Sequence, residues 1–255
     1  MSASSTMPAL ARYALALGDD ALIMSQRFGE WVTRAPQLEE DVALANIGLD
    51  LLGQARALLT YAGQVEGAGR DEDDLAYLRE ERDFLSCHLV QADNGDFGFS
   101  IARTLVFSTY QLELYRALGQ SSDATLAGIS AKAVKEVDYH LDHATEWTVR
   151  LGDGTALSRG RVQAGLDRAM RYAPELFEGS WIDPALLESG VAVDPSTLRA
   201  TCESTWRRVL ERATLDWPTS RPALGGGRRG VHTEPMGHLL AEMQHLHRSH
   251  PGASW

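Results

Sequence analysis

Apolar residues recur along much of the chain at intervals of three and four, the spacing typical of helices that bury one face. The pattern predicts a first long helix over about residues 8–32, with apolar residues on one face at Ala14, Leu17, Ala21, Met24, Phe28 and Trp31. Further helices are predicted over about 38–66, 97–118 and 124–151. Four helices of this length favour a four-helix bundle.

Local signals set the ends of these helices. Ala35-Pro36 stops the first, because a residue before proline avoids the helical region. The acids Glu39, Glu40 and Asp41 suit the first turn of the second helix, where the helix dipole favours negative charge. Asn94-Gly95 forms a turn, and Ser121, Ser122 and Asp123 are candidate caps of the fourth helix.

The remaining sequence also favours helices over strands. No segment alternates apolar and polar residues as a strand would, and RDEDDLAYLREERDF predicts a short helix between the second and third long ones. Weaker helical patterns follow at about 158–177, 195–215 and 234–248, with a loop over 218–232. We therefore predict an all-α fold: one domain over 1–255, with a core bundle at about 8–151 and a C-terminal helical extension at 155–255.

Composition and charge exclude several classes of protein. The formal net charge is −11, which argues against nucleic-acid binding. Cys87 and Cys202 are too few for a disulfide framework or a cysteine-rich zinc site. The N-terminal residues do not resemble a secretory signal, and Asp50, Gln54 and Arg56 interrupt the best candidate for a membrane span. We expect a cytoplasmic protein without membrane or nucleic-acid partners.

Polar residues interrupt the apolar faces of two helices. The second helix is apolar nearly all round, yet Asn46, Asp50 and Gln54 recur every four residues. The fourth helix carries a matching polar row at Lys132, Glu136, His140 and His143. Buried amides and charges need partners, so we expect the two rows to meet as a hydrogen-bonded, ion-paired core network.

A di-iron centre is the competing interpretation, because ferritin-like bundles place a histidine three residues after a glutamate on two helices. Here Gly53 lies three residues after Asp50, and Tyr139 lies three after Glu136. The spacing therefore favours a core without metal. The alternative, an active di-iron oxygenase, would draw its ligands from Asp50, Glu136, His140, His143, Glu30 and Gln111 or Glu113.

Other polar clusters could belong to a binding site or could serve the structure alone. Arg228 and Arg229 in GGGRRG suit either a phosphate contact or a basic surface loop. The acids at 71–74 are consecutive, so they do not face one another and favour a solvated helix start. His238, His245 and the C-terminal HLHRSH lack a zinc-helix pattern and are expected at an interface or at the surface. No nucleotide-binding loop or nucleophile elbow occurs.

Across nearly its whole length the sequence resembles a known family, the C subunits of bacterial phenylacetyl-CoA epoxidase. The resemblance rests on segments that occur in one order: LGDDALIMSQRFGEW, LEEDVALANIGLDLLGQARALL, DEDDLAYLREERDF, NGDFGFSIAR, SAKAVKEVDYHL, RLGDGT, GVAVDPSTLRA and GVHTEPMGHLLAEMQHLHRSHPG. It implies a ferritin-like helical fold and a non-catalytic role beside a catalytic A subunit that carries the di-iron site. It also implies a reductase component that uses NADPH with flavin and iron–sulfur groups, and no cofactor on this chain.

The resemblance further implies contact with the CoA substrate. The matching positions are Asp83, Phe84, Leu85 and Ser86, and a second segment at Pro184, Ala185 and Leu186. The side chains of both segments differ from those of relatives, so we expect contacts through the backbone. A stand-alone homodimeric bundle is a third hypothesis for the chain.

Overall fold

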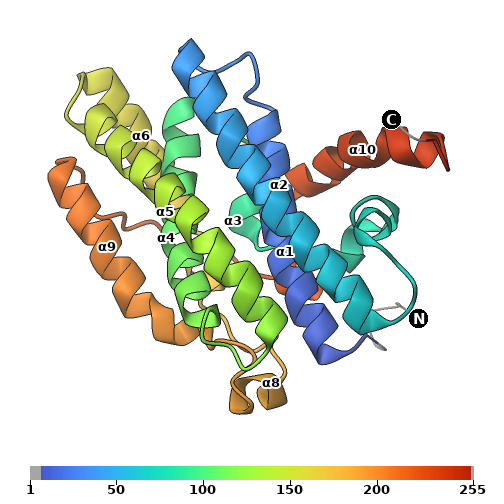
Figure 1. Ribbon diagram of the computed structural model, residues 1–255. Helices are drawn as coiled ribbons and strands as arrows, with labels where there is room; N and C mark the ends of the chain where they lie inside the picture. The colour runs from blue at the N-terminus through green and yellow to red at the C-terminus, as the bar shows by residue number, and fades with distance from the viewer. Residues whose placement is uncertain (1–6, 254–255) are drawn as a thin grey trace. The chain divides into compact units, whose positions relative to one another are not determined.

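The computed structural model describes residues 7–253, and every regular element within that range is helical. The prediction of an all-α fold, as expected for a ferritin-like protein, is therefore confirmed. The long helices are α1 (Ala9–Gly29), α2 (Leu38–Glu66), α4 (Phe97–Leu118) and α5 (Ala124–Gly152) (Figure 1). The second and third agree with their predicted bounds, whereas α1 stops three residues before the predicted end.

The chain divides into two compact units. One comprises residues 1–32, 42–93 and 226–255, and the other comprises 33–41 and 94–225. The predicted border between a core bundle and a C-terminal extension, at residues 151–155, does not appear as a break. The helices after α5 pack within the same unit as α4 and α5, and the last segment of the chain belongs with α1 instead.

In the first unit, α1 and α2 run side by side (Figure 1). Nearly every residue of α1 from Ala11 to Phe28 is buried, including the polar residues Asp19, Asp20, Ser25 and Arg27. The Ser25 hydroxyl donates a 2.7 Å hydrogen bond to the Gly48 carbonyl of α2, so the two helices approach closely at this point. A helix buried on all sides must satisfy its polar side chains internally.

Short helical turns surround α1 in this unit. They are η2 (Asp74–Leu78), η3 (Glu81–Asp83), α3 (His88–Gln91) and η5 (Gly227–Arg229), and α10 (Glu234–Ser249) follows them. The short helix predicted over residues 70–84 is thus two separate turns. Gln244 of α10 donates hydrogen bonds of 3.1 Å to the carbonyls of Ala76 and Arg79, which joins α10 to these turns.

In the second unit, α4 is the central helix. The neighbouring elements are α6 (Ala156–Met170), α7 (Ala173–Leu176), α8 (Pro184–Glu188), η4 (Pro195–Leu198) and α9 (Arg199–Arg212). Helices α5, α6 and α9 pack against α4. The crossing of α4 and α6 requires a glycine, because a Cβ at Gly165 would lie 2.7 Å from the Phe99 Cα.

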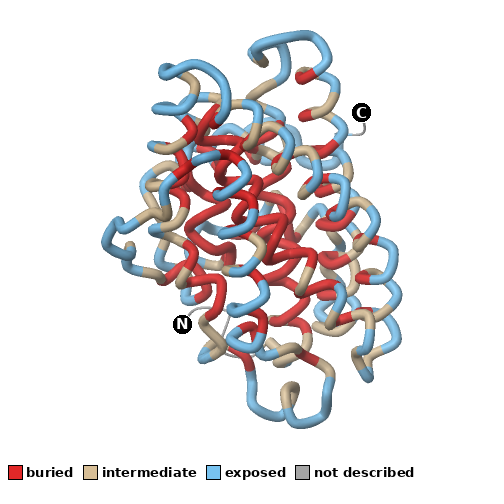
Figure 2. Tube along the Cα trace, turned by 90° about the vertical axis from the view of Figure 1, so that its left-hand side faces the viewer, coloured by how far each residue is buried: buried red, intermediate tan, exposed pale blue. Residues whose placement is uncertain are grey.

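Across the part of the chain that the structure describes, buried positions follow the inward sides of the helices, and many connecting loops are exposed (Figure 2). The non-helical residues 84–87 are an exception, because they are buried. Within the described residues, α2 alone is long and apolar enough to cross a membrane by length and composition. This differs from the expectation that its polar residues would prevent such a match. The finding is weak, because central helices of soluble proteins pass the same test.

Candidate functional site

Two adjacent aspartates in the middle of α1 organise the first unit. Asp19 is 0% exposed and Asp20 is 3% exposed, and apolar residues flank both. A buried carboxylate is costly unless a cation and hydrogen-bond donors neutralise it. Each of these two carboxylates has acquired such a set of partners from distant parts of the chain.

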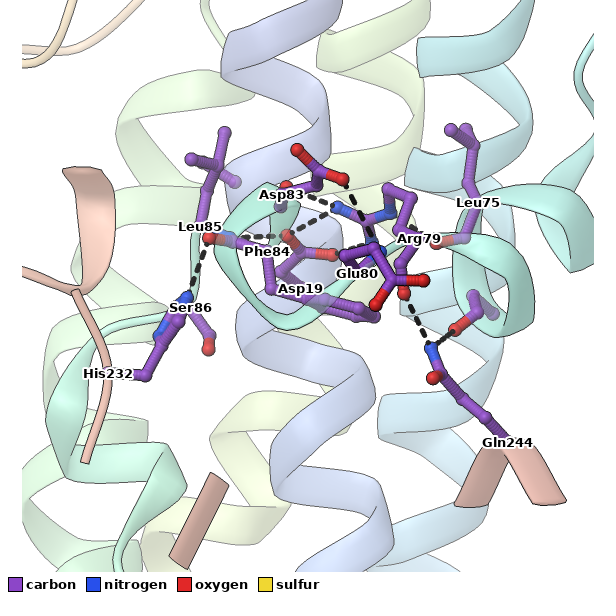
Figure 3. Close-up of polar contacts among 12 residues, drawn as sticks. Asp19, Leu75, Arg79, Glu80, Asp83, Phe84, Leu85, Ser86, His232 and Gln244 are labelled. Atoms are coloured by element: carbon purple, nitrogen blue, oxygen red, sulfur yellow. Dashed lines mark hydrogen bonds and ion pairs between the residues drawn. The ribbon is translucent and has the colours of Figure 1, made fainter. Parts of the chain in front are cut away.

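Asp19 is paired with Arg79 (Figure 3). The guanidinium donates two hydrogen bonds to the carboxylate, at 3.0 and 2.5 Å, in the bidentate arrangement that arginine favours. Arg79 also donates to the carbonyls of Leu75 and Asp83, and its guanidinium lies 3.9 Å from the centroid of the Phe84 ring. The pair therefore connects α1 to the two turns η2 and η3.

Asp20 is paired with Arg228, which is 2% exposed and lies in η5. Arg228 donates a 2.5 Å hydrogen bond to the carboxylate and further bonds to the carbonyls of Ala16 and Leu85. Burial raises the pKa of Asp20, and the Arg228 guanidinium and the Cys87 amide partly offset that effect. This second pair attaches the C-terminal part of the chain to α1.

The two pairs and two further side chains hold the backbone of residues 83–87. The amides of Leu85 and Cys87 donate to Asp19 and Asp20, at 2.7 and 2.8 Å. The carbonyls of residues 83, 84, 85 and 86 accept, in order, from Arg79, His232, Arg228 and Gln91. We call this stretch, residues 83–87, the clamped segment (Figure 3).

Two glycines allow the loop from Gly226 to Thr233 to lie against the clamped segment. A Cβ at Gly227 would lie 2.0 Å from the Ser86 carbonyl oxygen, and one at Gly230 would lie 2.2 Å from that of Arg82. Gly230 also has φ 71°, which glycine adopts without strain. The glycines of GGGRRG therefore serve backbone packing rather than exposure of donors to a phosphate.

His232 is neutral in this arrangement. Its Nε2 lies 3.0 Å from the Phe84 carbonyl and must donate to it, while its Nδ1 lies 2.8 Å from the Gln91 amide nitrogen and must accept. The Gln91 oxygen accepts from the amide of Thr233, which fixes the orientation of the Gln91 side chain. Burial lowers the pKa of His232, and the Phe84 carbonyl partly offsets the shift.

The polar row predicted on α2 is only partly buried. Asn46 is exposed, Asp50 is intermediate and Gln54 is 4% exposed. Four residues exceed one helical turn of 3.6 residues, so each step turns by about 40° and the row rotates from solvent into the interior. The prediction that all three residues line a core is wrong for Asn46.

The row on α5 rotates in the same way. Lys132 is exposed, Glu136 is intermediate and His140 is 2% exposed. Lys132 therefore does not belong to a core network, contrary to the prediction. The meeting of the α2 and α5 rows stays a prediction.

His143 has a different partner from the one expected. Its Nε2 lies 2.8 Å from the carboxylate of Glu40, and both side chains are less than 10% exposed. The sequence indicates Glu40 only as an acid in the first turn of α2. A histidine paired in this way to a single carboxylate forms a local contact within the second unit.

The donor set does not fit a ferritin-like di-iron centre. Between residues 7 and 253, no group of three or more His, Cys, Asp or Glu side chains is placed to hold a metal ion. Tyr139, which occupies the histidine position after Glu136, is 50% exposed and faces away from the interior. Gly53, the corresponding position after Asp50, is exposed with no atom within 4 Å of where its Cβ would lie.

The two segments expected to contact CoA differ in exposure. Phe84, Leu85 and Ser86 are 0–3% exposed within the clamped segment, and Asp83 is partly exposed at its edge. Pro184 and Ala185, at the start of α8, are exposed, and Leu186 is intermediate. The two segments belong to different units, and their contact with CoA stays a prediction.

The remaining clusters have ordinary structural roles. Arg228 is buried, so both the surface-loop and the phosphate interpretations of this residue are wrong, whereas Arg229 is exposed. His238 and His245 are exposed on α10, as expected. His247 of the same helix stacks on Tyr77 with ring centroids 4.9 Å apart.

Comparison with known proteins decides the family. Residues 1–255 match the family described as phenylacetic acid catabolic protein. The chain belongs to this family. It is 48% identical over 249 residues to the C subunit of the 1,2-phenylacetyl-CoA epoxidase of Escherichia coli (strain K12), a match that covers 98% of this chain and 100% of that relative. The resemblance seen in the sequence is therefore confirmed for this member of the phenylacetic acid catabolic family.

Sequence reasoning missed the residues that matter most in this site. Asp19, Asp20 and Arg79 stand out in the sequence only as members of two family segments, LGDDALIMSQRFGEW and DEDDLAYLREERDF. One signal was available: two consecutive acids within ALALGDDALIM have apolar neighbours on every side of the predicted helix. Buried acids require buried cations, but the sequence does not show which arginines would supply them.

Proposed function

We propose that this chain is a non-catalytic structural subunit of a phenylacetyl-CoA epoxidase, and that it supports a catalytic A subunit in aerobic phenylacetate degradation. The similarity to the C subunit of such an epoxidase over the whole chain supports the pathway and the assembly. The role of the chain within that assembly is argued from its buried charges.

The observation that carries the proposal is the use of Asp19 and Asp20. Carboxylates in the middle of a ferritin-type helix are potential iron ligands. Here arginines and backbone amides occupy both, and together they fix the clamped segment. Their contribution is to hold backbone in place, which is the property required of a subunit that shapes a neighbour.

The chemistry of the reaction then belongs to other components. We propose that the A subunit holds the di-iron site, that a reductase with NADPH, flavin and iron–sulfur groups supplies electrons, and that this chain binds none of these. We place the complex in the cytoplasm, without nucleic-acid or membrane partners. The net charge of −11 supports the absence of contact with nucleic acid.

A contact with CoA is part of the proposal. Asp83 at the edge of the clamped segment and the exposed start of α8, Pro184 and Ala185, remain accessible. The carbonyls of residues 83–86 are engaged by side chains. A substrate contact at the clamped segment would therefore use its exposed surface, which the ion pairs hold rigid. It would not use the backbone carbonyls of residues 83–86, because these already accept hydrogen bonds.

The test is reconstitution. The chain is co-expressed with the A subunit, and iron content and phenylacetyl-CoA-dependent oxygen consumption are measured with each subunit omitted in turn. We expect the pair to co-purify, iron to follow the A subunit, and turnover to require both chains.

A substitution distinguishes support from catalysis. His140→Ala should leave the iron content of the complex unchanged, because the proposal gives His140 no role as a ligand. Two irons in this chain when purified alone would overturn the structural role. Loss of metal and turnover on His140→Ala, with folding and assembly of the complex intact, would support the alternative that the chain is a di-iron oxygenase.

A further inference from the structure

The second unit contains an apolar pocket at one end of its helices. The pocket has a volume of about 260 Å³ and lies where α4 begins, α5 ends and α6 begins. Its walls include Phe97, Trp147, Leu151 and Leu157, and Arg161 stands at its margin. We call it the Trp147 pocket. None of its residues takes part in the buried pairs or the clamped segment.

The walls of the Trp147 pocket suit an aromatic ring. Phe97 and Trp147 meet edge to face, with centroids 5.0 Å apart and planes at 89°. A third ring can join such a pair favourably, since aromatic rings prefer edge-to-face or offset contacts. An apolar cavity of about 150 Å³ is known to take up benzene. The space available here therefore accommodates a ring with a short side chain.

Arg161 is the one cation among the polar side chains that line the Trp147 pocket, and it suits a carboxylate; the others are Gln37, Asp96, Thr155 and Ser158. The Arg161 side chain is 62% exposed, and its Nε lies 3.9 Å from the Asp96 carboxylate, which is longer than a hydrogen bond. Asp96 uses its other oxygen to cap α4, accepting from the Phe99 amide at 2.9 Å. The weak pair leaves guanidinium donors of Arg161 available for a carboxylate in the forked arrangement.

We propose that the Trp147 pocket binds a small aryl carboxylate, with the ring against Phe97 and Trp147 and the carboxylate on Arg161. This inference goes beyond the proposed function, because it assigns a ligand to the chain itself. The chain belongs to a family of phenylacetic acid catabolism, so phenylacetate is the probe of the right size and charge. Binding is non-covalent and involves no chemical step.

The experiment is a calorimetric titration of the full chain with phenylacetate. Three further titrations separate the contributions: phenylacetamide keeps the ring without charge, acetate keeps the charge without a ring, and phenylacetyl-CoA tests the thioester as the source of the ring. We expect one phenylacetate per chain, binding by phenylacetamide that is about fivefold weaker, and no measurable binding of acetate.

Substitutions test whether the binding measured by calorimetry takes place in the Trp147 pocket. Arg161→Gln should weaken phenylacetate binding about fivefold, and Trp147→Leu by a similar factor. Arg159→Gln is the matched control, because Arg159 is an exposed arginine of the same helix that does not line the pocket. It should leave the affinity unchanged. Thermal unfolding followed by circular dichroism confirms that each variant is folded.

Several results would overturn the proposal. They are the absence of saturable binding up to about 10 mM phenylacetate, equal binding in the wild type and both pocket variants, and tighter binding of phenylacetamide than of phenylacetate. The proposal would also be overturned if phenylacetyl-CoA bound more tightly than phenylacetate and Arg161→Gln left its affinity unchanged. The titration requires neither the A subunit nor turnover, so its outcome is independent of the test of structural support.

Discussion

Replacing Asp19 by asparagine tests whether the buried pairs hold the first unit together. Asp19 is 0% exposed and accepts three hydrogen bonds, two from Arg79 and one from the Leu85 amide. Asparagine has nearly the same shape, so the packing survives while the negative charge is lost. One of the two Arg79 donors would then face an amide NH2 group instead of an oxygen.

The expected cost is large because Arg79 cannot move to water without breaking other contacts. Its side chain is 2% exposed, and it also donates to the carbonyls of Leu75 and Asp83. Removing one partner of a buried ion pair typically destabilises a protein by about 3–5 kcal/mol. We expect Asp19→Asn to lower the free energy of unfolding by an amount in that range.

The measurement is urea unfolding at neutral pH, followed by circular dichroism. A double-mutant cycle with Arg79→Met isolates the pair, and we expect a coupling energy of about 2–3 kcal/mol, because the double variant no longer contains an unpaired buried charge. Arg116→Gln is the control: its side chain is 51% exposed in pairs with Glu113 and Asp138, and the expected cost is below about 1 kcal/mol.

The reasoning fails if Asp19→Asn costs no more than Arg116→Gln. It also fails if the cycle gives a coupling energy near zero, since the Asp19 and Arg79 contributions would then be independent. Either result would mean that water or a rearranged neighbour compensates the charge.

Two other predictions concern the loop that meets the clamped segment. Gly227→Ala should destabilise the protein by about 1–3 kcal/mol, because the new Cβ would lie 2.0 Å from the Ser86 carbonyl oxygen. Gly53→Ala, on α2 with open space around it, should stabilise the protein by about 0.5–1 kcal/mol. Urea unfolding compares the two variants, and equal effects would contradict the packing argument. Burial lowers the pKa of His232 in the folded state, so below about pH 6.5 the unfolded state takes up a proton first and the free energy of unfolding falls as pH falls, by up to about 1.4 kcal/mol per pH unit. His232→Gln should reduce this slope, and an unchanged slope between about pH 5 and 7 would refute the assignment.

The long helices could be predicted because their signals are local. The acids of the first turn of α2 and the Asn94-Gly95 turn before α4 lie within a few residues of the boundaries they set. The exposure of Lys132 could also have been predicted, because lysine is almost never fully buried. The exposure of Asn46 could not, since residues i and i+8 of a helix lie only about 80° apart and often share one buried face.

The central site could not be predicted because its partners are distant in sequence. Arg79 lies 60 residues from Asp19, and Arg228 lies 208 residues from Asp20. Nothing local distinguishes Arg228, which is buried, from Arg229, which is exposed. The division of the chain into two units follows from contacts of this kind, which bring the last segment back to α1 instead of leaving it as an extension.

The pairing of Asp20 with Arg228 has a consequence for synthesis of the protein. The chain is synthesised at about 5–20 residues per second, and α1 emerges first. Arg228, the cation that pairs with Asp20, is added much later. Until residue 228 has left the ribosome, the Asp20 carboxylate and the Leu85 carbonyl both lack a donor that they have in the finished protein. The first unit therefore closes only on a nearly complete chain. A product truncated before Gly226 would lack the Arg228 guanidinium and would leave the buried Asp20 carboxylate without its cation.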